Sequence, residues 1–171
     1  MFLMPPLDNR LSKAQVMALA GNLRHDECGI EEMFTQMKQT NNVQVANNAA
    51  WVLSYLFKED KEIYLFPRYG ELVDMATSTK LHIRRGLVLS ILADLPINEL
   101  NGKLLDYCLM HLADHKESNS SRSMMIKLAA RMCKPYAELC QELILCLDMI
   151  PQDSPPSIAA AKRNALKVIQ V

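Results

Sequence analysis

The sequence of 171 residues contains little glycine, few aromatic residues and no net charge. It has only five glycines and 6% aromatic residues, whereas half of its side chains are apolar, with many leucines, alanines and methionines among them. Unbranched side chains lose little rotamer freedom in a helix, so this composition favours helices. Because 19 basic residues balance 19 acidic ones, any electrostatic preference must come from how the charges are distributed along the chain.

The five cysteines are odd in number and form no C-x-x-C pair. Cys140 and Cys146 lie in an apolar helical run, where a free cysteine behaves as a small hydrophobic residue. We therefore expect reduced core thiols in a reducing compartment, and neither disulfides nor a metal site.

Long apolar runs are also missing. No stretch reaches the roughly 18 residues needed to cross a bilayer. The first ten residues lack the basic segment and the apolar run of a signal peptide. These absences predict a cytoplasmic protein that does not associate with membranes.

Catalytic signatures are absent as well. The sequence contains no G-x-x-x-x-G-K-[ST], G-x-G-x-x-G, G-x-S-x-G or H-E-x-x-H motif. His111 and His115 are spaced to share one helix face and a metal ion, but this helix lacks a third ligand and an activating glutamate. The simpler interpretation is a solvated helix end at which histidine complements the carbonyl dipole. We expect no cofactor, no metal and no catalytic residue.

One partial match points toward an enzyme. Residues 121–127 fit part of the G-S-x-x-M-x-x-K-x-N signature of the fumarase/adenylosuccinate lyase superfamily, with Ser120 in place of glycine and Ala129 in place of asparagine. In those enzymes the signature forms a mobile loop, and the site is built from three subunits over a very long helical bundle. Here the residues have helical periodicity with Met125, Leu128 and Met132 on the core face, so we interpret the match as spurious.

Apolar residues recur at helical spacing along nearly the whole chain, and no segment shows a sustained alternation of period two. Breakers and capping residues divide the chain into nine predicted helices, over residues 8–23, 27–39, 43–57, 60–76, 81–95, 98–115, 121–133, 136–150 and 157–171. Asp60 and Asn98 are predicted N-caps. Pro67 is expected to kink or restart the fourth helix, because proline cannot donate the helical hydrogen bond.

These helices repeat in pairs. Residues 49–56 realign on residues 85–92, 36 positions later, with matching apolar positions. Arg85 then precedes Arg122 by 37 positions, and Arg122 precedes Arg163 by 41. A period of this length with two helices in each repeat is typical of an α-solenoid. Since a lone helical pair cannot bury both apolar flanks, we predict one all-α domain over residues 1–171, a right-handed α-α superhelix of roughly four stacked pairs.

The order and spacing of several segments resemble those of short α-solenoid proteins of the HEAT/armadillo superfamily from Bacteroidetes bacteria. The segments that carry this resemblance are Ala49-Ala50-Trp51-Val52-Leu53, Ile83-Arg84-Arg85, Tyr136-Ala137-Glu138-Leu139 and Lys162-Arg163. The likeness extends from about residue 27 to the end of the sequence. It implies a HEAT- or armadillo-like fold and no established reaction. Asn48 departs from the arginine with which members of this group begin the tryptophan motif.

Charge is segregated between the two helices of each pair. The second helices over residues 121–134 and 157–171 carry only basic charges, whereas the first helix over residues 136–150 carries only acidic ones. In HEAT-like solenoids the second helices line the concave face. We therefore predict a basic groove with a row of arginines formed by Arg84, Arg85, Arg122 and Arg163. The alternative is that these arginines pair with acidic residues of neighbouring turns and only support the fold.

The leading functional prediction is a non-enzymatic scaffold that binds a protein or an acidic peptide through this basic face. Binding of a nucleic-acid backbone by the same face, as in HEAT-like alkylpurine DNA glycosylases, is the alternative. Zero net charge, few aromatic residues and the uncharged helix over residues 43–57 count against it. The oligomeric state stays open, because the ends of a solenoid must be either capped or paired.

Overall fold

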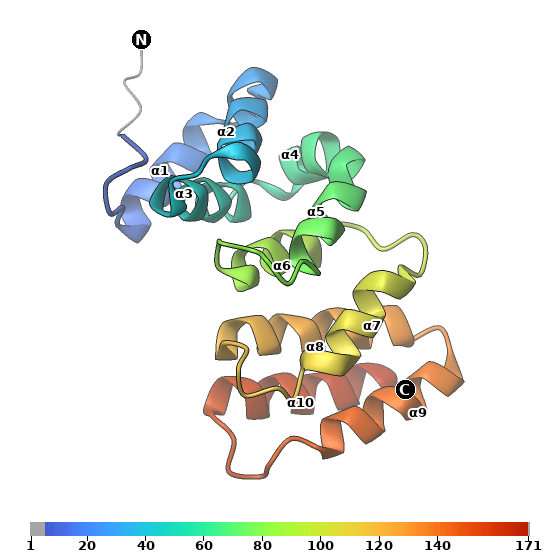
Figure 1. Cartoon of the computed structure of the whole chain (residues 1–171). Coiled ribbons are helices and arrows are strands. Elements are labelled where there is room, and N and C mark those ends of the chain that lie inside the picture. Colours follow the sequence, from blue (N-terminus) through green and yellow to red (C-terminus); the bar gives the residue numbers. More distant parts are fainter. Residues whose placement is uncertain (1–5, 171) are drawn as a thin grey trace.

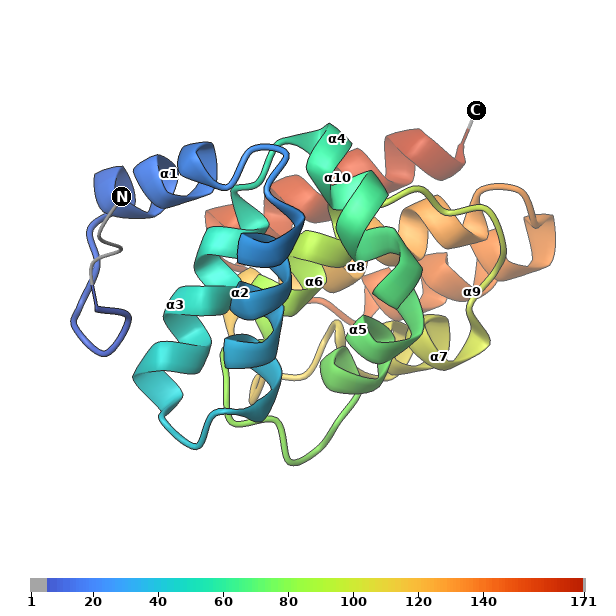
Figure 2. The same ribbon diagram turned by 90° about the horizontal axis from the view of Figure 1, so that it is seen from above.

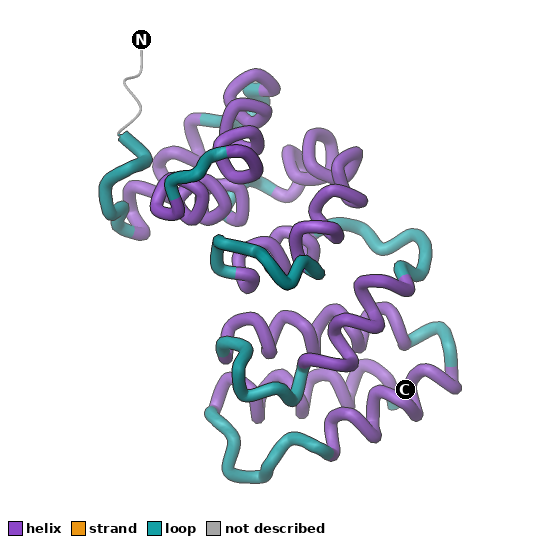
Figure 3. Tube along the Cα trace, viewed as in Figure 1, coloured by secondary structure: helices purple, strands orange, loops and turns teal. Residues whose placement is uncertain are grey.

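The computed structural model describes residues 6–170, and every regular element among them is helical (Figure 3). The longer helices are α1 (Lys13–Asn22), α2 (Glu27–Gln39), α3 (Val43–Ser54), α5 (Tyr69–Ala76), α6 (Arg85–Asp94), α7 (Gly102–His111), α8 (Asn119–Cys133), α9 (Ala137–Asp148) and α10 (Pro156–Ile169). Three short elements, α4 (Lys58–Asp60), η1 (Lys61–Leu65) and η2 (Phe66–Arg68), run without a break into α5. With residues 58–76 taken as one segment, the nine predicted helices are confirmed within residues 6–170, and the predicted end of the last one, Val171, lies outside the described residues.

The helices stack in pairs along one direction (Figure 1). Helix α3 contacts α6, α6 contacts α8, and α8 contacts α10, so these four helices form one layer. The partners α2, α4–α5, α7 and α9 form a second layer beside it, as the view from above shows (Figure 2). Helix α1 packs on α3 ahead of the four pairs. This arrangement is the predicted α-solenoid.

Local sequence explains where most helices begin. The side chains of Ser12, Asp26, Asn42, Asn101 and Ser118 each accept a hydrogen bond from a backbone N–H in the first turn that follows. Such caps satisfy donors that have no partner within the helix. Short polar side chains therefore cap the N-termini of α1, α2, α3, α7 and α8.

Two predicted caps are wrong. Helix α4 begins at Lys58, so Asp60 lies inside the helical segment, fully buried, and accepts a hydrogen bond of 3.2 Å from the backbone N–H of His25. The backbone of α3–α4 places this carboxylate against the turn before α2, where it satisfies a donor distant in sequence. Asn98 is exposed, and Asn101, directly before Gly102, caps α7 instead.

Pro67 restarts the fourth helix, as predicted. The chain passes through a π-helical turn at Lys61–Leu65 and a 3-10 turn at Phe66–Arg68 before regular α-helix resumes at Tyr69. Proline has no N–H to donate, so the regular hydrogen-bond ladder cannot run through this position. The irregular turns keep the segment helical in spite of the interruption.

One continuous apolar core lies between the two layers. Helix α6, in the middle of its layer, buries Val88, Leu89, Ile91 and Leu92 completely. The buried thiols of Cys108 and Cys133 belong to the same core, and burial raises the pKa of each to about 12. They therefore remain protonated and pack as small apolar groups. None of the helices in the described part of the chain has the length and apolarity needed to span a membrane.

Candidate functional site

Arg122 belongs to the interior of the stack. Its side chain lies at the start of α8, the residue is only 3% exposed, and its Nε donates a hydrogen bond of 2.9 Å to the main-chain carbonyl of Leu112. Leu112 is the C-cap residue that directly follows α7. The last carbonyls of a helix have no partner within the helix and carry the negative end of its dipole. Arg122 therefore caps the C-terminus of the preceding helix.

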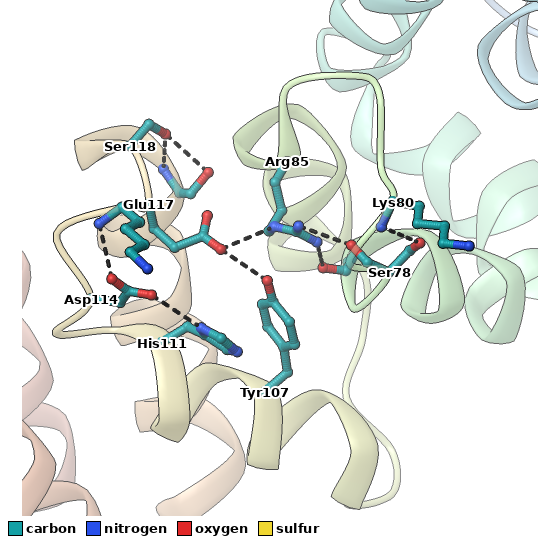
Figure 4. Close-up of polar contacts among 11 residues, drawn as sticks. Ser78, Lys80, Arg85, Tyr107, His111, Asp114, Glu117 and Ser118 are labelled. Carbon is teal, nitrogen blue, oxygen red and sulfur yellow. Dashed lines mark hydrogen bonds and ion pairs between the residues drawn. The ribbon is translucent and has the colours of Figure 1, made fainter.

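Arg85 has the same role one repeat earlier (Figure 4). Its guanidinium donates to the main-chain carbonyls of Ala76, the last residue of α5, and of Ser78, two residues beyond it. It also reaches into the next pair, where Nε lies 3.4 Å from Oε1 of Glu117 and the guanidinium lies 4.9 Å from the ring centre of Tyr107. The sequence-based alternative of pairing with a neighbouring acidic residue thus describes Arg85 well.

The predicted row of four arginines is therefore divided. Arg85 and Arg122 are drawn toward helix ends, whereas the side chains of Arg84 and Arg163 are exposed. The physical reason is that each second helix starts beside the C-terminus of its partner, where buried carbonyls need donors. The repeat of Arg85 and Arg122 along the sequence reflects this capping role. Arg122, being buried, cannot line a groove.

The contact of Arg85 with Glu117 is part of a polar clamp between the second and third pairs (Figure 4). Tyr107 Oη donates a hydrogen bond of 2.9 Å to Glu117, and its ring stacks on His111 with the ring centres 4.2 Å apart. Nδ1 of His111 lies 3.6 Å from the carboxylate of Asp114. Residues 6–170 contain no group of three or more potential metal ligands. The polar groups of this clamp are directed at one another, so we assign the clamp a structural role.

The clamp predicts a dependence of stability on alkaline pH. Burial, and then the hydrogen bond to Glu117, raises the pKa of Tyr107 to about 12. Since the folded state holds this proton more tightly, the stabilisation is complete below pH 10 and is lost as the pH rises through about 12. We expect Tyr107→Phe to lower the free energy of unfolding by about 0.5–1.5 kcal/mol at neutral pH. Above pH 10 the free energy of unfolding should decrease less with rising pH in this variant than in the parent chain.

Urea titrations at a series of pH values would measure this effect. Tyr136→Phe is the matched control, because Tyr136 is 46% exposed and has no side-chain hydrogen bond within residues 6–170. If the free energy of unfolding of Tyr107→Phe decreases above pH 10 as steeply as that of the parent chain, the assignment is contradicted.

The segment that resembles the lyase signature forms the first turns of α8. Ser121 is buried, and Ser118 donates a hydrogen bond of 3.0 Å to its hydroxyl. Met125, Leu128 and Met132 are buried as well. The expectation of a helix with these three side chains in the core is therefore confirmed.

A groove of about 530 Å³ lies between α8 and α10 on the exposed side of their layer. Met124, Lys127 and Arg131 of α8 line it together with Ala161, Asn164 and Val168 of α10. Alanine side chains at the contact leave a hollow that larger residues would fill. The groove also contains Ser123, whose buried Oγ has no hydrogen-bond partner in the described part of the chain.

The charged residues that line the groove, Lys127 and Arg131, are both cations. Helices α8 and α10 contain no acidic residue. The side chains of Lys127, Lys134, Arg163 and Lys167 are exposed and form no ion pair with any carboxylate of residues 6–170. Arg131 is held in place, because its guanidinium donates to the carbonyls of Ala93 and Leu95 at the end of α6. The basic character predicted for the second helices is therefore concentrated here.

A second hollow, of about 460 Å³, lies where α6 and α8 end. It is lined by Lys61, Asp94 and Arg131, among others. The Lys61 ammonium group is buried and lies 2.6 Å from the Asp94 carboxylate and 2.6 Å from the carbonyl of Ser54. Because these charges neutralise each other, this hollow has less to offer a charged partner than the α8–α10 groove.

Comparison with known proteins gives a fold family and no individual relative. A family model described as a HEAT repeat domain matches residues 4–169. No curated protein and no solved structure matches the chain.

Proposed function

The chain belongs to the HEAT repeat domain family, and we propose that it is a non-enzymatic scaffold that binds an acidic segment of another protein on the exposed face of α8 and α10. HEAT repeats commonly mediate protein interactions, because their stacked helices present extended surfaces. The observation that carries the proposal is the set of exposed cations on α8 and α10 without an acidic residue on either helix. Carboxylates of a partner would supply the missing counter-charges.

The same cations offer a second candidate ligand, the phosphate backbone of a nucleic acid. Phosphate binding would replace condensed counterions, so its affinity would fall steeply with salt. The acidic face of α9, with Glu138, Glu142 and Asp148 exposed one helix away, opposes the approach of a long polyanion. A short acidic segment can contact α8 and α10 without approaching α9. We therefore favour the protein ligand.

Fluorescence anisotropy with two probes separates these candidates. The probes are a labelled peptide in which glutamate alternates with glycine and a labelled DNA duplex, each titrated at about 50 mM and about 200 mM salt. We expect the peptide to bind. The double variant Lys127→Glu, Arg163→Glu should lower the affinity for this peptide by about tenfold or more. Lys80→Glu is the control, because Lys80 is exposed in the loop before α6.

The outcomes are distinct. Peptide binding that does not respond to the double variant, or no binding at the lower salt concentration, refutes the proposed face. Tighter binding of the duplex, with a steep decrease at the higher salt concentration, favours the nucleic-acid alternative. Equal losses with Lys80→Glu and with the double variant indicate a diffuse charge effect and no defined site.

A further inference from the structure

The floor of the α8–α10 groove is apolar and only partly covered. Ala130 and Ala165 at its base are 2% and 3% exposed, whereas Met124, Ala161 and Val168 above them are half-buried against the core. The partly covered apolar groups lie between exposed Lys127 on one helix and exposed Asn164 on the other. An apolar floor with a polar rim fits a ligand that has one apolar side and polar flanks.

The length of the groove suits two to three turns of helix. Its lining extends from Ser123 to Arg131 along α8 and from Ser157 to Val168 along α10. At a rise of 1.5 Å per residue these spans correspond to about 12 Å and about 17 Å. A helix of that length presents one ridge of three or four side chains spaced three and four residues apart.

Backbone hydrogen bonding favours a helical occupant over an extended one. Apart from the end turns, the main-chain groups of α8 and α10 are used within these helices, and Ser123, Ser157 and Asn164 are the uncharged polar side chains that line the groove. An extended segment would bring a row of N–H and C=O groups to this apolar floor with few partners. A helix satisfies its own backbone and needs only an apolar ridge and compatible flanks.

The charges around the groove determine which side chains are favoured beside the apolar ridge of the bound helix. Lys127 is exposed and lines the groove, Arg163 and Lys167 are exposed elsewhere on α10, and neither groove helix carries a carboxylate. Glutamate or aspartate beside the apolar ridge would therefore be attracted, and lysine or arginine repelled.

We infer that the α8–α10 groove binds an acidic amphipathic helix of a partner protein, with its apolar ridge on Met124, Ala161 and Val168 and its carboxylates beside Lys127. This inference rests on the proposed function and adds the conformation and the apolar pattern of the partner to it. The occupant is a segment of a different protein; a second copy of this chain is the competing possibility.

The test compares two peptides of about 18 residues, long enough to sample helix in water. One has leucine along a single helix face with glutamate on both flanks, and the other has the same composition in a scrambled order. We expect the amphipathic peptide to bind at least about tenfold more tightly and to gain helicity by circular dichroism on binding. The scrambled peptide reports the electrostatic attraction alone.

Two neighbouring alanines of α10 provide a matched pair of variants. Ala160 lines the groove, whereas Ala159, equally half-buried, does not. We expect Ala160→Trp to fill the groove and to lower the affinity for the amphipathic peptide by about tenfold or more. Ala159→Trp should change this affinity by no more than about twofold. Thermal unfolding of both variants verifies that each is folded, and Ala160→Leu replaces Ala160→Trp if the tryptophan variant does not fold.

Equal affinities of the two peptides, or an amphipathic peptide that is insensitive to the change at Ala160, overturn the helix inference while the acidic-segment proposal stands. If neither peptide binds at about 1 mM, both proposals fail. Light scattering addresses the competing occupant, because a dimer that Ala160→Trp dissociates would show that a second copy of the chain fills the groove and would overturn the inference.

Discussion

Reversing the charge of Arg122 should remove much of the stability of the stack. In Arg122→Glu the carboxylate would lie beside the Leu112 carbonyl, which now accepts a hydrogen bond of 2.9 Å from the arginine. Two acceptors would then face each other in a site that is 3% exposed. A buried charge without a partner costs about 3–5 kcal/mol, a large part of the roughly 5–15 kcal/mol that holds a domain folded. Urea unfolding followed by circular dichroism would measure the loss.

Arg163→Glu is the control for this experiment. Arg163 follows Arg122 in the sequence repeat, but its side chain is exposed. An exposed substitution away from special features changes stability by no more than about 0.5 kcal/mol. Equal losses for the two variants would contradict the different roles that the structure assigns to these arginines.

Leu89→Ala should destabilise the whole stack, because Leu89 is fully buried in α6 and α6 contacts α3, α5 and α8. Removing the buried branched side chain leaves a cavity, and such a change costs about 2–5 kcal/mol. In a solenoid, stability is distributed through contacts between neighbouring pairs. Damage in a central helix therefore weakens both of its neighbours. Hydrogen exchange should show faster opening of α3, α6 and α8 together.

Ile158→Ala is the matched variant at the end of the layer. Ile158 is also fully buried, but α10 contacts only α8 and α9 closely among the described helices. We expect a similar local loss, with faster exchange confined to α9 and α10, because a terminal pair can open without the others. Uniform acceleration over all helices in this variant would indicate that the stack unfolds as one unit.

The candidate site was predictable in its charge and not in its geometry. The absence of acidic residues from α8 and α10 is evident in the sequence, and it correctly identifies the most basic helices. The sequence does not show that Arg122 turns inward while Lys127 remains exposed on the same helix. The cytoplasmic location, the bacterial origin and the absence of catalysis stay predictions.

The missed groove has a weak signal in the sequence. Ala159-Ala160-Ala161 and Ala165 place small side chains along α10, which is compatible with close helix packing or with a hollow. The two outcomes differ only in where α8 lies. Since periodicity specifies which face of a helix is apolar but not the distance to its neighbour, the hollow could not be inferred from the chain alone.

The sequence by itself determined the helices and their pairing, because the apolar period of a helix, the capping side chains and the 36- to 41-residue repeat are local or repeating features. Only the tertiary structure decided the role of each arginine. A guanidinium on a flexible side chain can face solvent, a carboxylate or an unpaired carbonyl, and the choice depends on which helix end lies nearby. At Arg85 and Arg122 the ends of α5 and α7 lie within reach, and the cost of leaving buried carbonyls without donors turns both side chains inward.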